Sequence, residues 1–290
     1  MGSLYLTESK TVTVRVEGAS LRIEEQGCPH LYVPARRVER AVVWGGVLLD
    51  TAALTLLLSH GAPICFAARD GRLLGVAWPP LSPAAGGAAL LERRRADPEW
   101  VTAYRSLLDA EVRRARLGLV RSLDATVWSR WRDRGFRGKD WEAWRQRAFS
   151  SAGPELDAAW RYLKTLLLGA VSGWLLSEGF DPHRGVLDAK VRLGLVKEFV
   201  QPLTPWIDGA ALWGQRSGVL ARGTWIGQRG EIELTPAGVR RWTARFEAEL
   251  AWLERDVRRR IDEVVVLARD WQPEPVRPVS NSGSRPIRRV

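Results

Sequence analysis

Residues 79–87, Pro-Pro-Leu-Ser-Pro-Ala-Ala-Gly-Gly, divide the chain into two parts that differ in hydrophobic period. Three prolines and two glycines within nine residues are typical of a linker. Before this stretch apolar and polar residues alternate, whereas after it apolar residues recur at the three-to-four-residue spacing of an amphipathic helix. The change of period predicts an α+β fold, in which a small N-terminal β-rich domain is followed by a larger all-helical domain.

The N-terminal part, residues 1–79, has the pattern of short strands joined by tight turns. Residues 11–16 and 21–24 alternate apolar and polar side chains, and residues 17–20, Glu-Gly-Ala-Ser, fit the hairpin turn between them. Residues 51–59 have helical spacing and end at a His-Gly pair that is typical of a helix C-terminus. We therefore expect this domain to contain several strands and one helix.

Residues 80–97 form the predicted linker, and residues 98–272 the predicted helical domain. A long helix is expected from residue 100 to 127, because Asp97-Pro98 supplies a capping carboxylate followed by a proline at the first helical position. The remaining expected elements are helices over about 139–150, 155–178, 189–201, 205–217 and 235–270, with a hairpin near 225–234. Residues 273–290, rich in proline and ending in Arg-Arg-Val, are expected to be a disordered basic tail.

The charge balance favours a polyanionic partner. The chain has 290 residues, with 44 Lys and Arg against 33 Asp and Glu and a net charge of +11. Only five of the cations are lysines. A high-GC genome explains this preference for arginine but not the net charge, so nucleic acid is the favoured partner.

No apolar run reaches the ~18 residues that span a bilayer, and the N-terminus lacks the pattern of a signal peptide. The two cysteines, Cys28 and Cys65, are too few for a disulfide framework or a zinc site. These observations predict a cytoplasmic protein that is not bound to a membrane.

A set of ordered motifs extends from about residue 4 to residue 255. In the first domain they are Arg-Arg-Val-Glu-Arg-Ala-Val-Val-Trp-Gly (36–45), Gly-Ala-Pro-Ile-Cys-Phe (61–66) and Asp-Gly-Arg-Leu-Leu-Gly (70–75). In the second they include Gly-Phe-Asp-Pro-His-Arg-Gly-Val-Leu (179–187), Lys-Glu-Phe (197–199) and Ile-Glu-Leu-Thr-Pro-Ala-Gly (232–238). Each motif is weak alone, but the order resembles the CRISPR-associated Cas1 family of integrases, which capture new spacers.

The resemblance implies a magnesium or manganese site made by a glutamate, a histidine and an aspartate. In this chain the histidine position is Asp188 and the aspartate position is Gly194. The glutamate position falls at Glu142, with Asp140 as the alternative. One ligand is thus kept, one is changed in kind and one is lost, which leaves Glu142 and Asp188 as the candidate catalytic and metal-binding residues.

Other residues do not readily rebuild the site. If Asp188 and Glu198 lay on one helix they would be ~15 Å apart along its axis, too far to share an ion whose ligands lie ~2 Å away. His183 is either a displaced ligand or, as we favour, a surface residue after an Asp-Pro turn. Tryptophans near residues 128–144 could stack on unpaired bases, but their helical spacing favours a buried face.

The resemblance implies a role in CRISPR adaptation. In that role the protein would bind DNA, form a homodimer through the β-rich domain and assemble with a small Cas2-like partner. The candidate DNA-contacting cations are Arg113, Arg114, Arg116, Arg145, Arg184, Lys190 and Arg192. The ligand count favours a degenerate relative that keeps these surfaces over an active endonuclease or integrase with a non-standard site. A non-enzymatic subunit of an unrelated nucleoprotein complex is the remaining alternative.

Overall fold

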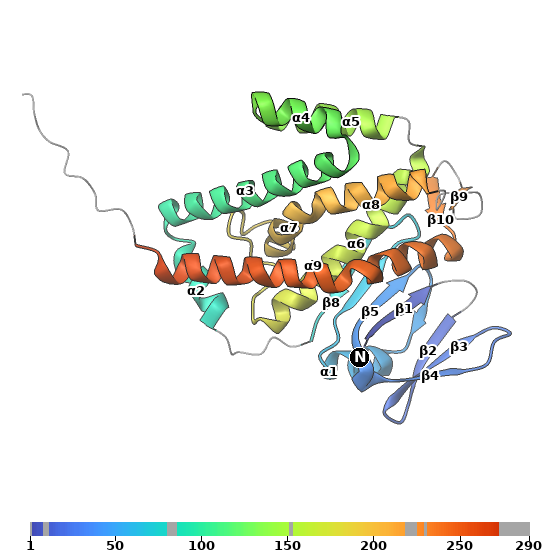
Figure 1. The fold of residues 1–290 in the computed structure, drawn as a ribbon. Helices are drawn as coiled ribbons and strands as arrows, with labels where there is room; N and C mark the ends of the chain where they lie inside the picture. The colour runs from blue at the N-terminus through green and yellow to red at the C-terminus, as the bar shows by residue number, and fades with distance from the viewer. Residues whose placement is uncertain are drawn as a thin grey trace, which may run out of the picture.

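The structure, a computed structural model, describes residues 2–7, 12–79, 86–150, 153–217, 225–228 and 231–272. An N-terminal part built from two sheets is followed by a larger helical part, as the change of hydrophobic period predicts (Figure 1). The predicted tail, residues 273–290, lies outside the described residues.

The first sheet has the order β1-β5-β7-β8. Its strands are β1 (Gly2–Thr7), β5 (Val38–Trp44), β7 (Ile64–Ala67) and β8 (Leu73–Ala77), of which the first three run parallel and β8 is antiparallel to β7. Helix α1 (Thr51–Ser59) lies in the crossover from β5 to β7. Residues 41–44 of β5 and all of β7 are apolar, as expected for strands covered on both faces.

The second sheet has the order β4-β3-β2-β6. It consists of β2 (Val12–Glu17), β3 (Ser20–Glu25), β4 (Leu31–Pro34) and the short β6 (Leu48–Leu49), with the 3-10 turn η1 (Ala35–Arg37) after β4. Glu17 pairs with Ser20, so the predicted hairpin turn is confirmed, and Gly18 supplies the positive φ of 61° that a tight turn of this kind needs.

The helical part begins with α2 (Gly86–Arg94), which lies within the segment predicted as a linker. It continues with α3 (Pro98–Leu123), α4 (Ala125–Arg134), α5 (Gly138–Ser150), α6 (Pro154–Ser177), α7 (Gly194–Val200), the 3-10 turn η2 (Gln201–Leu203) and α8 (Thr204–Arg216). A hairpin of β9 (Trp225–Gln228) and β10 (Glu231–Leu234) precedes the long α9 (Pro236–Asp270).

Two expected helices differ from those in the structure. The helix predicted over 100–127 ends at Leu123, because the Asp124 carboxylate accepts a hydrogen bond from Val127 N (3.0 Å) and caps a new helix, α4. The helix predicted over 189–201 is wrong in its first turn. Leu193 has left-handed backbone angles (φ 58°, ψ 37°), and α7 begins only at Gly194.

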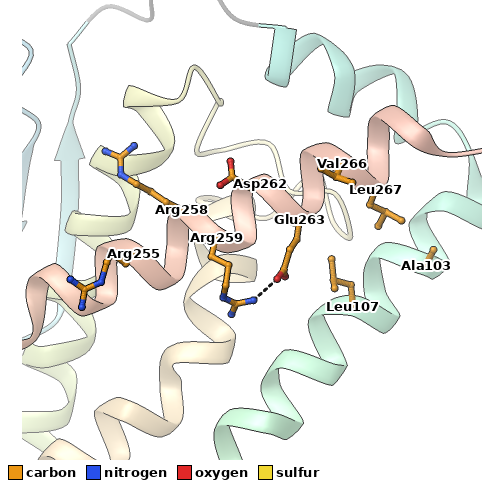
Figure 2. A pocket seen from close by; sticks show the side chains of 9 residues that line it. All are labelled: Ala103, Leu107, Arg255, Arg258, Arg259, Asp262, Glu263, Val266 and Leu267. Carbon is orange, nitrogen blue, oxygen red and sulfur yellow. Dashed lines mark hydrogen bonds and ion pairs between the residues drawn. The ribbon is translucent and has the colours of Figure 1, made fainter.

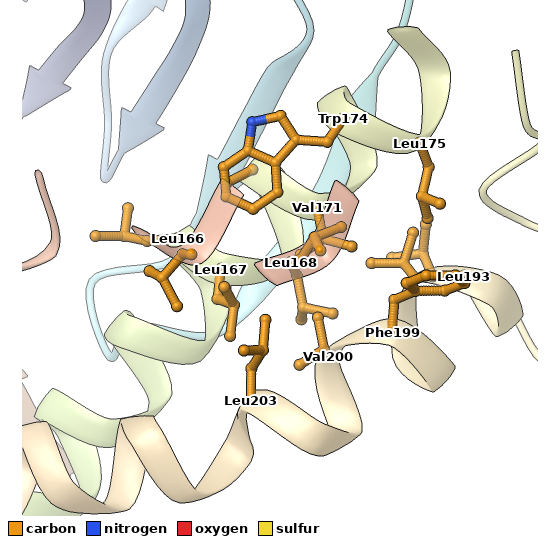
Figure 3. Packing of buried hydrophobic residues seen from close by; sticks show 14 of the residues in the cluster. Leu166, Leu167, Leu168, Val171, Trp174, Leu175, Leu193, Phe199, Val200 and Leu203 are labelled. Carbon is orange, nitrogen blue, oxygen red and sulfur yellow. The ribbon is translucent and has the colours of Figure 1, made fainter. Parts of the chain in front are cut away.

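The first sheet and the helices share a core centred on α6. Val42, Trp44 and Cys65 from the first sheet belong to the same buried cluster as the apolar face of α6. On another side, Leu166, Leu167 and Val171 of α6 lie close to Phe199 and Leu203 in the α7–η2 segment (Figure 3). This packing holds α7, and the loop before it, against the middle of the molecule.

Gly71 shows how closely the first sheet approaches α6. A Cβ at this position would lie 2.7 Å from Tyr162 N and 2.9 Å from Ala158 O, and φ is +83°. The turn is also fixed by Thr165, whose hydroxyl donates to Gly71 O at 2.7 Å. The β7–β8 turn therefore tolerates glycine alone.

The tryptophan stripe is structural, as its spacing predicts. Trp131, Trp141 and Trp144 are buried and pack with Val120, Leu156, Ala211 and Leu212 in a second cluster beneath α4 and α5. These helices lie at the end of the molecule away from the sheets (Figure 1). The stripe therefore forms a buried face of this helical layer rather than a row of exposed rings.

Candidate nucleic-acid site

The loop between α6 and α7, residues 178–193, carries the Gly-Phe-Asp-Pro motif and folds back on itself. Asp181 accepts a hydrogen bond from His183 N (2.9 Å), and His183 O accepts one from Gly194 N (3.0 Å). A Cβ on Gly194 would lie 2.7 Å from Gly185 N and 2.9 Å from Asp188 O. The backbones on the two sides of the loop are thus in contact, and Gly194 has no room for any side chain.

Glu198 of α7 holds this loop in place. It is buried, and its carboxylate accepts hydrogen bonds from Val186 N (3.1 Å), Leu187 N (2.8 Å) and the Tyr104 hydroxyl of α3 (2.8 Å). Burial raises the pKa of Glu198, although these three donors oppose the shift. Both carboxylate oxygens are therefore occupied by hydrogen bonds within the protein.

A cavity of about 370 Å³, here called the signature cavity, lies between this loop, α6 and α7. Its lining combines four charged side chains with mostly apolar neighbours: Lys164, Leu168, Leu187, Asp188, Val191, Gly194, Lys197, Glu198, Val200, Gln201 and Thr204. Asp188 is in the loop and does not share a helix with Glu198, and the turn at Leu193 brings both residues to this cavity.

Lys164 is the partly buried cation of the signature cavity. Its ammonium nitrogen lies 4.9 Å from the centre of the Trp160 ring, a cation–π contact. Burial lowers the pKa of Lys164, and the positive charges of Lys197 and Arg145 lower it further. This side of the cavity therefore has a positive electrostatic potential.

Asp188 is exposed, and its carboxylate accepts a hydrogen bond from Lys190 N at 2.9 Å. Glu142 is an exposed residue of α5 whose nearest cation is Arg116, 3.6 Å away. Glu142 is not among the residues that line the signature cavity. The alternative, Asp140, caps the start of α5, where it accepts hydrogen bonds from Arg137 N (3.0 Å) and Arg134 (2.9 Å).

The residues present do not fit the divalent ion that the family resemblance implies. Across the part of the chain that the structure describes, no group of three or more His, Cys, Asp or Glu side chains is placed to hold a metal. Gly194 offers no ligand, Glu198 is occupied by three donors, and two lysines line the cavity. His183 is exposed and packs its ring against Trp78 (4.4 Å between centroids).

The seven predicted DNA-contacting cations fall into two groups. Arg114, Arg116, Arg145 and Arg184 pair with Glu111, Glu142, Asp208 and Glu92 respectively. Arg113, Lys190 and Arg192 are exposed and form no ion pair with the described residues. The second group keeps its charge available for an external anion.

Arg145 has a structural partner that the sequence alone did not indicate. Its Nε lies 3.1 Å from both carboxylate oxygens of the buried Asp208 on α8, which also accepts from the Trp160 indole at 2.9 Å. Burial raises the pKa of Asp208, while Arg145 acts to lower it. The pair joins α5 to α6 and α8 close to Lys164.

A larger cavity of about 810 Å³ lies between α3 and α9, and two of its three arginines are paired with carboxylates (Figure 2). Arg259 bonds to Glu263 at 2.5 Å and to Glu111 at 2.8 Å, and Arg258 bonds to Glu254 and Glu178. Ala103, Leu107, Val266 and Leu267 make the rest of the lining apolar. Arg255 is thus its one cation without an ion pair to a described residue, whereas the signature cavity has two, Lys164 and Lys197.

The comparisons with known proteins agree with this architecture. Residues 4–126 match the family model described as CRISPR associated protein Cas1. A curated relative, "CRISPR-associated endonuclease Cas1 1" of Thermus thermophilus, is 31% identical over 86% of this chain and 86% of its own length.

Two solved structures share the fold. The Cas1 protein TM1797 from Thermotoga maritima has a TM-score of 0.75 and 16% identity, with 91% of this chain and 97% of that chain covered. A casposase bound to integration product has a TM-score of 0.73 and 16% identity, with 94% and 92% covered. None of the described helices is long and apolar enough to cross a membrane. On the identity and coverage of the Thermus relative, the chain belongs to the CRISPR-associated protein Cas1 family.

Proposed function

We propose that this protein is a CRISPR adaptation protein that binds DNA in the cytoplasm and joins a spacer-integration complex without a family-type metal centre of its own. The observation that carries the proposal is the signature cavity. It is formed in part by the loop that carries the Gly-Phe-Asp-Pro motif, yet it is lined by Lys164 and Lys197, and Gly194 has no room for a ligand side chain.

Family membership supports DNA as the partner, and the charge supports it independently. The net charge is +11, and three of the seven predicted contact residues, Arg113, Lys190 and Arg192, are exposed without an ion pair to the described residues. Arginine and lysine side chains that are free of carboxylates can displace the counterions of a phosphate backbone, which drives DNA binding.

A homodimer formed through the N-terminal sheets and a small Cas2-like partner complete the proposal. The edge strand β4 supports the dimer, because its Leu31 and Tyr32 are 58% and 50% exposed. An edge strand with uncovered apolar side chains offers both unpaired backbone groups and apolar area to a second chain.

The test is to measure binding and chemistry in the same samples. Purified protein is mixed with labelled duplex and splayed DNA, in EDTA, in Mg²⁺ and in Mn²⁺. Fluorescence anisotropy then reports binding, and denaturing gels report cleavage or strand joining. We expect binding in all three conditions and no cleaved or joined product from the protein alone.

Failure to bind either DNA would contradict the proposal. Metal-dependent cleavage or joining that is lost in Glu142→Ala or Asp188→Ala would contradict the catalytic part and identify an active enzyme with a non-standard site. Asp133→Ala is the matched control, because Asp133 is an exposed carboxylate of α4 that does not line the signature cavity.

A further inference from the structure

Lys164 and Lys197 come from different elements and line the same cavity. Lys164 is on α6 and Lys197 on α7, three residues after Gly194. Over the described residues, neither ammonium group donates a hydrogen bond to the protein or forms an ion pair; Lys164 is half-buried and Lys197 is exposed. Two such cations close together repel each other, and an anion between them removes that cost.

The carboxylates of the cavity do not neutralise these lysines. Glu198 is turned toward Val186 N, Leu187 N and the Tyr104 hydroxyl. Asp188 is exposed and accepts the backbone N–H of Lys190. The lysines are therefore free to bind an external anion.

We propose that Lys164 and Lys197 bind a phosphate group of DNA directly in the signature cavity, in the place where a divalent ion would be expected from the family resemblance. This inference rests on the proposed function, because it names the part of the DNA that this site binds. An ammonium group is a compact cation with three donors, which suits the oxygens of a phosphate. Gln201, exposed on the same lining, adds an amide donor.

A direct lysine–phosphate contact differs from a metal-bridged one in two measurable ways. It does not need a divalent ion, so EDTA leaves it intact. It also contributes one displaced counterion per phosphate, so the salt dependence of DNA binding becomes shallower when it is removed.

The experiment compares the DNA affinity of the wild type, Lys164→Met, Lys197→Met and the double variant by anisotropy in excess EDTA across a salt series. Methionine keeps the aliphatic stem and removes the charge. Lys139→Met is the matched control, since Lys139 is an exposed lysine of α5 that does not line the cavity. Circular dichroism and thermal unfolding verify that each variant is folded, and Lys197→Met, at an exposed position, tests the proposal even if Lys164→Met is unstable.

We expect each single variant to bind DNA several-fold more weakly and the double variant about tenfold more weakly, with the salt slope of the double variant reduced by about one. Lys139→Met should match the wild type. Wild-type affinity in the folded double variant would overturn the inference while leaving the proposed function standing. An affinity that rises with Mn²⁺ and loses that rise in Asp188→Asn would also overturn it, in favour of a metal site. If the wild type fails to bind DNA, the proposed function fails, and this inference fails with it.

Discussion

Position 194 accepts only glycine, because the backbone of the loop between α6 and α7, residues 178–193, packs directly against it. Three backbone atoms, Gly185 N, Asp188 O and Gly185 Cα, lie 2.7 to 2.9 Å from where its Cβ would be. Backbone atoms held by hydrogen bonds on both sides cannot move aside cheaply, unlike the end of a flexible side chain. An aspartate at this position would require a different loop.

We predict that Gly194→Ala lowers the free energy of unfolding by about 1–3 kcal/mol, because the added methyl group overlaps these atoms. Gly118→Ala on α3 is the control. Its Cβ would meet nothing within 4 Å, and alanine in an exposed helix should be favourable by about 0.5–1 kcal/mol. Urea unfolding followed by circular dichroism measures both changes. Equal stability of Gly194→Ala and the wild type would show that the loop is looser than described.

Lys164 shows why the charged lining could not be found from the sequence alone. It is the one lysine of α6, three residues after Arg161, and a charged residue in such a helix usually points to solvent. The loop and α7 must first pack on α6 before Lys164 and Lys197 line one cavity. The motif did locate the site along the chain, through Asp188 and Gly194, but neither Lys164 nor Tyr104 carried a signal of its own.

Among the secondary-structure elements, the start of α3 is joined to the end of α9 by one carboxylate. Asp97 accepts hydrogen bonds from Glu99 N (3.0 Å), Trp100 N (3.2 Å) and the Trp271 indole (2.8 Å). The hydrogen bond from Trp100 N is the largest cause that lowers the pKa of Asp97. The ionised form is thus favoured in the folded protein.

A carboxyl group whose pKa is lower in the folded than in the unfolded state stabilises the protein at any pH above its unfolded-state pKa. This stabilisation is lost as the pH falls through the folded-state pKa. We predict that Asp97→Ala lowers the melting temperature at neutral pH, and that the difference from the wild type narrows in acid. Thermal unfolding across a pH series measures it. Asp133→Ala, which removes one partner of an exposed ion pair, should change little at any pH. A difference for Asp97→Ala that is constant with pH would contradict this account of the cap.

Local signals predicted most elements of the fold. The structure contains the helix that begins at Pro98, the turn at Gly18 and the strands that the alternating pattern predicts. Each of these depends on residues close together in the sequence. Helix α2 lies inside the predicted linker, and the two errors in helix bounds have different causes. Asp124 sits in a helical pattern yet caps a second helix, and Leu193 takes a left-handed conformation that packing of the loop, rather than its own preference, imposes.

For the whole molecule, composition predicted the sign of the charge but not its distribution. Much of the arginine excess on α9 is paired with acids: Arg258 with Glu254, and Arg259 with Glu111, Asp256 and Glu263. Lys190 and Arg192, the exposed cations of the loop between α6 and α7, have no such acidic partner in the described part of the chain. The surface that attracts DNA is therefore smaller than the arginine count suggests.

The salt dependence of DNA affinity tests this account most directly. The logarithm of the association constant of the wild type is measured against the logarithm of the salt concentration, in EDTA. If Lys164 and Lys197 together contact one phosphate and Lys190 and Arg192 contact one each, we predict a linear decrease with a slope of about −3. An affinity that does not change with salt, or the absence of binding at low salt, would contradict the claim that the positive charge of this protein serves to bind DNA.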